Sequence, residues 1–158
     1  MIAIDVRNPR VELPTDLAKL VGKPTLMRMT FEAVEATEWP KPMPAEENCT
    51  SEPVLRTLLA YCYCSGVFAS REIHASARHD ASVRYLCAND FPTWEQIRQF
   101  RRNNVSHLRE TLARTLRAMS DESGDSVSPS FFPYLAEADR RLRLAVEADS
   151  AAMDDWAA

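Results

Sequence analysis

The stretch TWEQIRQFRRNNVSHLRETLARTLRAM, residues 93–119, decides the fold prediction. Thr93 and Gln96 have the spacing of a capping box, in which each side chain bonds to the other residue's backbone at a helix start. Apolar side chains then recur at helical spacing, but their direction turns by roughly 60–80° at Asn103 and Asn104, two poor helix formers. The stretch therefore predicts two helices, residues 94–102 and 105–119, or one helix bent at the asparagines.

Helical signals continue along most of the remaining sequence. Pro53 in a first turn and Gly66 at the end enclose an apolar segment that is typical of a buried helix. Met27, Phe31 and Val34 recur at helical spacing and form the expected inward face of a helix at residues 25–38. Alternation around Met27 also permits a strand, but no turn signal interrupts this run, so the helix is preferred. Residues 39–51, with three alternating prolines, form a linker. The other expected helices cover residues 15–21, 71–79, 81–88 and a last segment from Pro133.

The whole pattern predicts an all-α, multi-helix fold. Its most buried helix is expected at residues 53–65, where Leu55, Leu58, Leu59 and Cys62 form one apolar face. We divide the 158 residues into an N-terminal helical segment and proline-rich linker (1–51), a helical domain (52–119), and a loop with an acidic C-terminal helix (120–158).

The low glycine content excludes several nucleotide-binding classes. The chain has three glycines, and no two of them are close in sequence. Hairpin-rich folds use more glycines in their turns, and a dinucleotide-binding turn needs three that are closely spaced. The sequence shows no secretory signal, so a cytoplasmic chain is expected, in which the four cysteines are thiols rather than disulfides. The spacing of Cys62 and Cys64 does not suit one metal on a helix. No cofactor, metal or membrane-spanning segment is therefore expected.

Charge is unevenly distributed along the chain, whose net charge is −4. Residues 52–118 carry ten basic side chains, all arginine, and six acidic ones, whereas residues 119–158 carry three basic and nine acidic side chains. Local charge, rather than total charge, sets the affinity for phosphate. The middle segment therefore suits a nucleic acid, and the acidic segment is able to fold over the same basic face and compete with it.

The helix at residues 94–103 is the candidate DNA-binding element. Its arginines lie within about 100° of arc, away from Ile97 and Phe100, and a short helix at 81–88 precedes it in helix-turn-helix order. Arginine binds phosphate or guanine, and amide side chains pair with adenine. An ordinary amphipathic helix with a solvated basic face is the alternative. The candidate DNA-binding residues are Gln96, Arg98, Gln99, Arg101, Arg102, Asn103 and Arg109.

Several segments, together covering roughly residues 52–118, resemble one family. It is the N-terminal, InsH-like domain of bacterial insertion-sequence transposases of the DDE class. The similar segments are Tyr61–Val67 (YCYCSGV), Ser70–Ile73 (SREI), Ala77–Asp80 (ARHD), Arg84–Leu86 (RYL) and Phe91–Arg102 (FPTWEQIRQFRR). The resemblance implies a helical module that binds DNA ends. The family's catalytic acids lie in a later nuclease domain, so no catalytic residue is carried over.

The expected function is non-catalytic binding of double-stranded DNA. A helical protein-interaction module that has the same fold and no longer binds DNA is the alternative. The inward face of the last helix is predicted to carry Leu135, Ala138, Leu142 and Val146. Leu144 lies off that face, which indicates a contact with a second copy or another protein through residues 133–156.

Overall fold

Helices form the whole regular structure of the described residues. The structure, a computed structural model, describes residues 25–44, 47–88, 90–124 and 128–157. In those ranges the helices are α2 (Leu26–Ala36), α3 (Glu52–Ser65), α4 (Ser70–His79), α5 (Ala81–Cys87), α6 (Trp94–Asn103), α7 (Val105–Glu122) and α8 (Phe132–Ala157). The all-α prediction is confirmed. The predicted helix at residues 15–21 lies outside the described residues.

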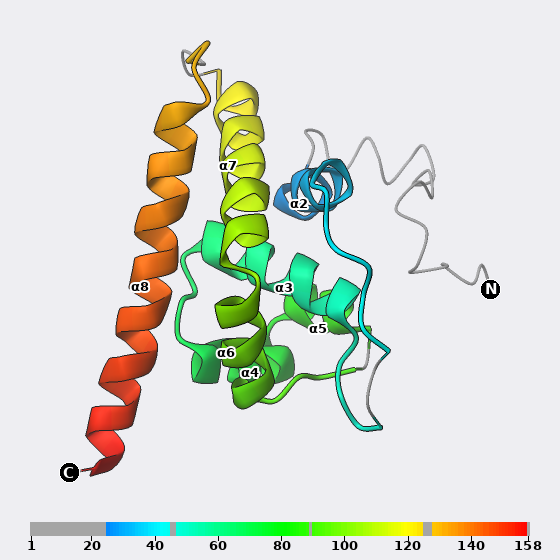
Figure 1. Ribbon diagram of the computed structural model, residues 1–158, viewed down its shortest axis with the longest axis vertical. Coiled ribbons are helices and arrows are strands. Elements are labelled where there is room, and N and C mark those ends of the chain that lie inside the picture. Colours follow the sequence, from blue (N-terminus) through cyan, green and yellow to red (C-terminus); the bar gives the residue numbers. More distant parts are fainter. Residues whose placement is uncertain (1–24, 45–46, 89, 125–127, 158) are drawn as a thin grey trace.

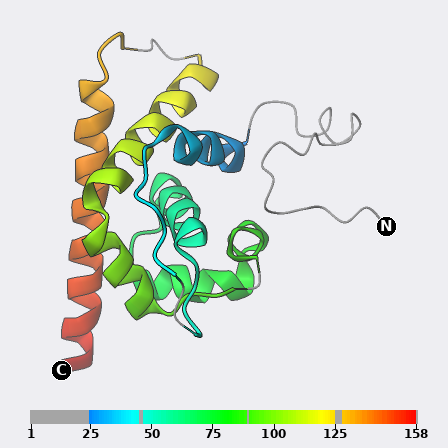
Figure 2. The same ribbon diagram turned by 45° about the vertical axis from the view of Figure 1, so that its right-hand side comes forward.

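The central helix is α3. It contacts α2, α5, α6, α7 and α8, and Leu58, Leu59 and Tyr63 are among its fully buried side chains. In Figure 1, α6 and α7 follow one another beside the long α8, and Figure 2 shows α3 enclosed between them and α5. The prediction that residues 53–65 form the most buried helix agrees with this central position.

Local signals place most helix ends correctly. Thr93 and Gln96 form the predicted capping box, and Gly66 ends α3 in a left-handed conformation with φ of 88°. The backbone breaks between α6 and α7 at Asn104, as the turn in the apolar stripe predicts. Asp80 caps α5, because its carboxylate accepts from the backbone N–H groups of Ser82 and Val83.

Helix α2 is confirmed against the strand alternative, but its inward face differs from the expected one. Met29, Thr30 and Ala33 are buried, whereas Met27 and Phe31 pack on the core from its edge. Thr30 is tolerated inside because its hydroxyl donates to the carbonyl of Leu26 at 2.8 Å.

The inward face of α8 also differs from the prediction. Val146, expected inside, is 53% exposed, and Asp149 is buried instead. Ala138, Leu142 and Ala145 complete the inner face and belong to the same core cluster as residues of α3, α6 and α7. Asp149 continues this face at helical spacing, and a charged partner, described below, compensates its burial.

Helix α5 packs on α3 and α4, and α6 packs on α3, α4 and α7. The order of α5 and α6 in the chain agrees with a helix-turn-helix. The helix-turn-helix centre nevertheless stays a prediction, because the main contacts of these two helices are with other elements.

Candidate nucleic-acid interface

The seven candidate residues fall into three groups by exposure. Gln99, Arg102 and Asn103 are exposed, while Gln96, Arg98 and Arg109 are half-buried. Arg101 is buried, with 7% of its surface exposed. The expectation that all three arginines of α6 lie away from the core and are available to DNA is therefore wrong for Arg101, whose side chain is directed at α8.

Arg101 lies in a buried polar network. Its Nη1 is 2.7 Å from Asp149 Oδ2, and the same nitrogen donates to Tyr63 Oη at 3.3 Å and to Ser70 Oγ at 3.4 Å. Asp149 also accepts from the backbone N–H and the hydroxyl of Ser70, both at 2.7 Å. Burial raises the pKa of Tyr63 to about 12, so its hydroxyl stays neutral beside the ion pair.

Ser70 is the first residue of α4, one residue before the expected start at 71, and Ala69 takes the cap position. The unpaired N–H groups of a helix start favour an anion, and here the anion comes from α8. Tyr63, Ser70 and Arg101 come from α3, α4 and α6, and Asp149 of α8 joins them in one network. These residues therefore have a structural role, independent of any contact with DNA.

A second contact of α8 stabilises the end of α3. Arg141 Nη1 donates to the backbone carbonyls of Tyr63 at 2.7 Å and Cys64 at 2.9 Å. The last carbonyls of a helix lack backbone donors and favour a cation. Arg141 and Asp149 lie two turns apart on α8, so this one helix binds both sides of the α3–α4 connection.

Glu137 holds Arg141 in position. Its carboxylate accepts from Arg140 at 2.7 and 2.8 Å and from Arg141 Nε at 2.8 Å. The hydrogen bonds from Arg140, followed by those from Arg141, lower the pKa of Glu137 to about 2, although partial burial opposes this. The ionised carboxylate is therefore favoured in the folded state.

We expect Glu137→Gln to lower the free energy of unfolding at pH 7, by an amount that shrinks below pH 4.5. The pKa of Glu137 falls on folding from 4.5 to about 2, so its contribution is present above the higher value and is lost as the pH falls toward the lower one. Urea unfolding at several pH values between 7 and 3 measures the difference. Exposed Glu147 supplies the control, Glu147→Gln; a Glu137 difference that stays constant with pH would contradict the assignment.

Two further candidate arginines are also engaged by α8. Arg109 makes a two-pronged contact with Asp139, at 2.7 and 3.0 Å. Arg98 Nε is 3.8 Å from Asp149 Oδ2, and Arg98 Nη1 is 3.1 Å from the sulfur of Met153. The expectation that the acidic C-terminal segment covers part of the basic face thus agrees with the structure.

Gln96 is occupied by its capping role. The backbone N–H of Thr93 donates to Gln96 Oε1 at 2.9 Å, so this oxygen is not available to a base without loss of the cap. The candidate residues that remain exposed, Gln99, Arg102 and Asn103, lie close together on one side of α6 at helical spacing.

One basic surface, on α4, is not among the site residues predicted from the sequence. Arg71, His74 and Arg78 have the spacing i, i+3 and i+7 and so share one side of this helix. The Arg71 guanidinium carbon lies 4.6 Å from the centroid of the Trp94 ring, and that of Arg98 lies 5.6 Å from it. The spacing of these three residues was enough to predict a shared side of α4 from the sequence. The position of Trp94 beside Arg71 is seen only in the structure.

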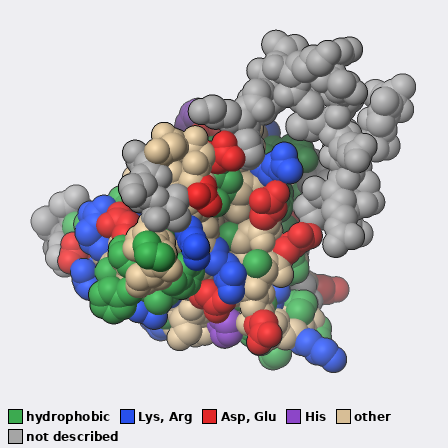
Figure 3. All heavy atoms as spheres, turned by 90° about the horizontal axis from the view of Figure 1, so that it is seen from above, with side chains coloured by type: hydrophobic (Ala, Val, Ile, Leu, Met, Phe, Trp, Pro, Cys, Tyr) green, Lys and Arg blue, Asp and Glu red, His purple; other side chains and the backbone are tan. Residues whose placement is uncertain are grey.

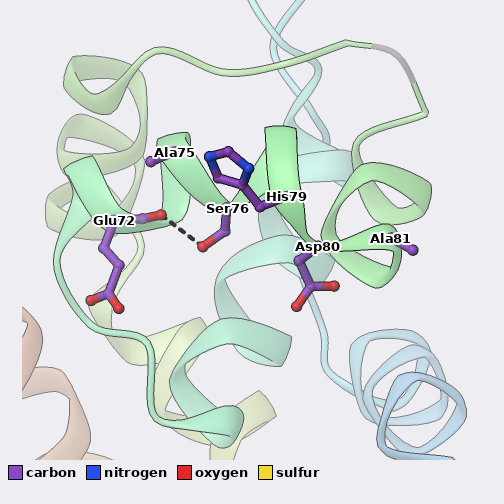
Figure 4. Close-up of a pocket in the computed structure, with 6 residues that line it drawn as sticks. All are labelled: Glu72, Ala75, Ser76, His79, Asp80 and Ala81. Atoms are coloured by element: carbon purple, nitrogen blue, oxygen red, sulfur yellow. Dashed lines mark hydrogen bonds between the residues drawn. The ribbon is translucent and has the colours of Figure 1, made fainter.

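The other side of α4 borders a shallow, open hollow of about 630 Å³. In Figure 4 the carboxylates of Glu72 and Asp80 point to the same side and the His79 ring lies away from them. Ser76 donates its hydroxyl to the backbone carbonyl of Glu72 at 2.8 Å. This is the usual bond of a helical serine, so the hollow gives no reason to assign Ser76 as a nucleophile.

Three cysteines lie in the core. Burial raises the pKa of the Cys64 thiol to about 12 and that of Cys87 to about 11, and it raises the pKa of Cys62 as well. These thiols stay protonated at neutral pH and are poor nucleophiles. Among residues 25–44, 47–88, 90–124 and 128–157, no group of three or more His, Cys, Asp or Glu side chains is placed to hold a metal ion.

Acidic and basic side chains are interspersed on the face seen in Figure 3. Every helix in the described ranges is too short or too polar to cross a membrane.

No protein family, curated protein or solved structure matches this chain.

Proposed function

We propose that this chain is a non-catalytic module that binds duplex DNA through the exposed side of α6. The observation that carries the proposal is the exposure of Gln99, Arg102 and Asn103 on one side of a helix whose other side is fixed in the core by Ile97 and Phe100. Such a helix presents one cation for phosphate and two amides for base edges at low entropic cost.

The pairing of Arg101 and Arg109 with α8 changes the expected salt dependence of DNA binding. Arg101 and Arg109 are paired at 2.7 Å, whereas Arg98 is held less closely, with its Nε 3.8 Å from Asp149 Oδ2, so Arg98 and Arg102 are the candidate phosphate contacts of α6. Each contact contributes about −0.9 to the slope of log affinity against log salt, so two predict a slope of about −2. The resemblance to the transposase domain supports the same function, and a cytoplasmic location is part of the proposal.

The test is fluorescence anisotropy with a labelled random-sequence duplex, starting at about 50 mM salt. We expect Arg102→Ala to weaken binding and to flatten the salt slope by about one, because one phosphate contact is lost. Arg117→Ala, which removes an exposed arginine from α7, is the matched control. Gln99→Ala or Asn103→Ala is expected to change sequence preference and leave the slope nearly unchanged. If the duplex does not bind at low salt, the proposal fails.

A protein-interaction module is the second candidate function. The observation in its favour is a set of exposed apolar side chains along the seam where α8 borders α6 and the start of α7. Val105, Val146 and Met153 are each about half exposed. Val105 lies one turn before Arg109, and Val146 and Met153 follow Asp139 at seven-residue spacing, so all three lie on the side where these helices meet. Light scattering at two concentrations tests whether a second copy occupies this seam through residues 133–156.

A further inference from the structure

A strip of basic side chains runs along α4, on the side away from Glu72, Ser76 and His79. It consists of Arg71, His74 and Arg78, which we call the α4 basic strip. Arg78 is exposed, and Arg71 and His74 are half-buried. At about 100° per residue the three lie within about 60° of arc, so one extended ligand is able to contact all of them.

Two aromatic side chains, one from the segment before α6 and one from the first residue of α6, lie along this strip. Phe91 is 45% exposed, and Trp94 lies 4.6 Å from the guanidinium of Arg71. Arg98, one turn further along α6, has its guanidinium carbon 5.6 Å from the centroid of the same Trp94 ring. Cationic and aromatic groups therefore alternate from Arg78 through Phe91 and Trp94 toward α6, where the proposed duplex contact begins.

A hollow of about 240 Å³ lies beside Phe91 and is lined by His74, Ala77, Arg78 and Phe91. The small Ala77 leaves room, and the ring of His74 is held in place by a 2.9 Å bond from Nδ1 to the carbonyl of Pro92. Because a carbonyl only accepts, Nδ1 carries the proton in this arrangement. The hollow thus combines an aromatic wall, an oriented imidazole and a guanidinium.

The charges around the hollow are mainly positive. Arg84 donates to the carbonyl of Arg78 at 2.7 Å, which adds a second guanidinium at this end of α4. The carboxylate of Asp90 is bonded to Thr50 and to the backbone of Ser51. Two acidic residues adjoin the strip's aromatic residues in sequence: Asp90 directly precedes Phe91, and the exposed Glu95 directly follows Trp94.

We propose that the α4 basic strip binds unpaired nucleotides of a DNA ligand, with one base stacked on Phe91 in the hollow and its neighbouring phosphates on Arg71 and Arg78. This inference rests on the proposed DNA-binding function and names the part of the ligand that α4 contacts. In an intact duplex both faces of each base are covered by stacking, so an exposed ring beside a hollow suits an unstacked base. The guanidinium of Arg78 lines the hollow, and Arg71 lies two turns away on the same side of α4, so the two suit the phosphates that flank such a base.

The test compares three labelled DNAs of one sequence: a blunt duplex, the same duplex with a single-stranded overhang, and the single strand alone. We expect the full-length protein to bind the overhang duplex about tenfold more tightly than the blunt one, as expected for one stacked base. Phe91→Ala is expected to remove this preference and leave the blunt-duplex affinity unchanged. Arg78→Ala is expected to reduce the preference for the overhang duplex. Phe132→Ala, a change at a 72% exposed phenylalanine of α8, is the matched control.

The outcomes separate this inference from the function on which it rests. Equal binding of the blunt and overhang duplexes overturns the α4 site and leaves duplex binding by α6 intact. An overhang preference that Phe91→Ala does not change also overturns it, because the stacking surface then lies elsewhere. Binding of the single strand or overhang in a Phe91-dependent way, without binding of the blunt duplex, supports the α4 site and overturns the α6 proposal.

Discussion

Leu59→Asp is expected to prevent folding at room temperature. Leu59 is 0% exposed at the centre of α3, the helix that contacts α2, α5, α6, α7 and α8. An unpaired carboxylate at this position loses its hydration and finds apolar neighbours, at a cost of several kcal/mol. The total stability of a domain of this size is about 5–15 kcal/mol, so one such change removes much or all of it.

Far-UV circular dichroism and thermal melting measure this effect directly. Val54→Asp is the matched control, because Val54 is half-buried in the first turn of the same helix. A new carboxylate there is placed favourably relative to the helix dipole, so we expect little loss of stability. A cooperative melt of the Leu59 variant at the parent temperature would mean that this face of α3 is not buried.

Asp149→Asn is expected to cost about 3–5 kcal/mol of unfolding free energy. The amide keeps the size of the carboxylate but leaves the buried guanidinium of Arg101 without its counter-charge at 2.7 Å. It also weakens the contact with the start of α4 at Ser70. Urea unfolding, followed by tryptophan fluorescence and circular dichroism, gives the free energy difference.

A surface ion pair provides the contrast. Asp139→Asn removes the partner of Arg109, whose side chain is 38% exposed, and exposed pairs contribute about 0–1 kcal/mol. The double variant Arg101→Met with Asp149→Leu removes both buried charges and is expected to recover much of the loss. Equal costs for the Asp149 and Asp139 variants would contradict the assigned burial of the α8 network.

The helices and their ends were predictable because their signals are local. Thr93 with Gln96, Pro53 with Gly66, and the break at Asn104 all act over a few residues, and the structure confirms each of them. Such signals need no knowledge of distant partners, since they satisfy backbone groups of the same helix.

The pairing of Arg101 with Asp149 was not predictable in this way. Both residues are charged, and charged side chains are normally exposed unless they are paired. Their positions in the sequence are far apart, so only the packing of α8 against α6 brings them together. The prediction that Val146 faces inward was wrong for the same reason. The inward face of α8 ends in the carboxylate of Asp149, so it lacks the purely apolar pattern by which an inward face is recognised in a sequence.

Gln96 illustrates a different difficulty, since one residue matched two roles. Its position three residues after Thr93 predicted a cap, and its amide also suited an adenine. The structure engages the side chain in the cap, where both hydrogen bonds of the box form. The exposed candidates are thereby reduced to a compact set on α6, with the α4 basic strip beside it.

The most direct test of the central claim is amide chemical-shift mapping of the isotope-labelled protein during titration with a duplex at about 50 mM salt. Binding through the exposed side of α6 predicts that the largest shifts fall on residues 98–103. The outer face of α8 is expected to stay unchanged under the same conditions. An absence of shifts at saturating duplex, or shifts confined to residues 132–153, would contradict DNA binding by α6 and would favour an interaction surface on α8.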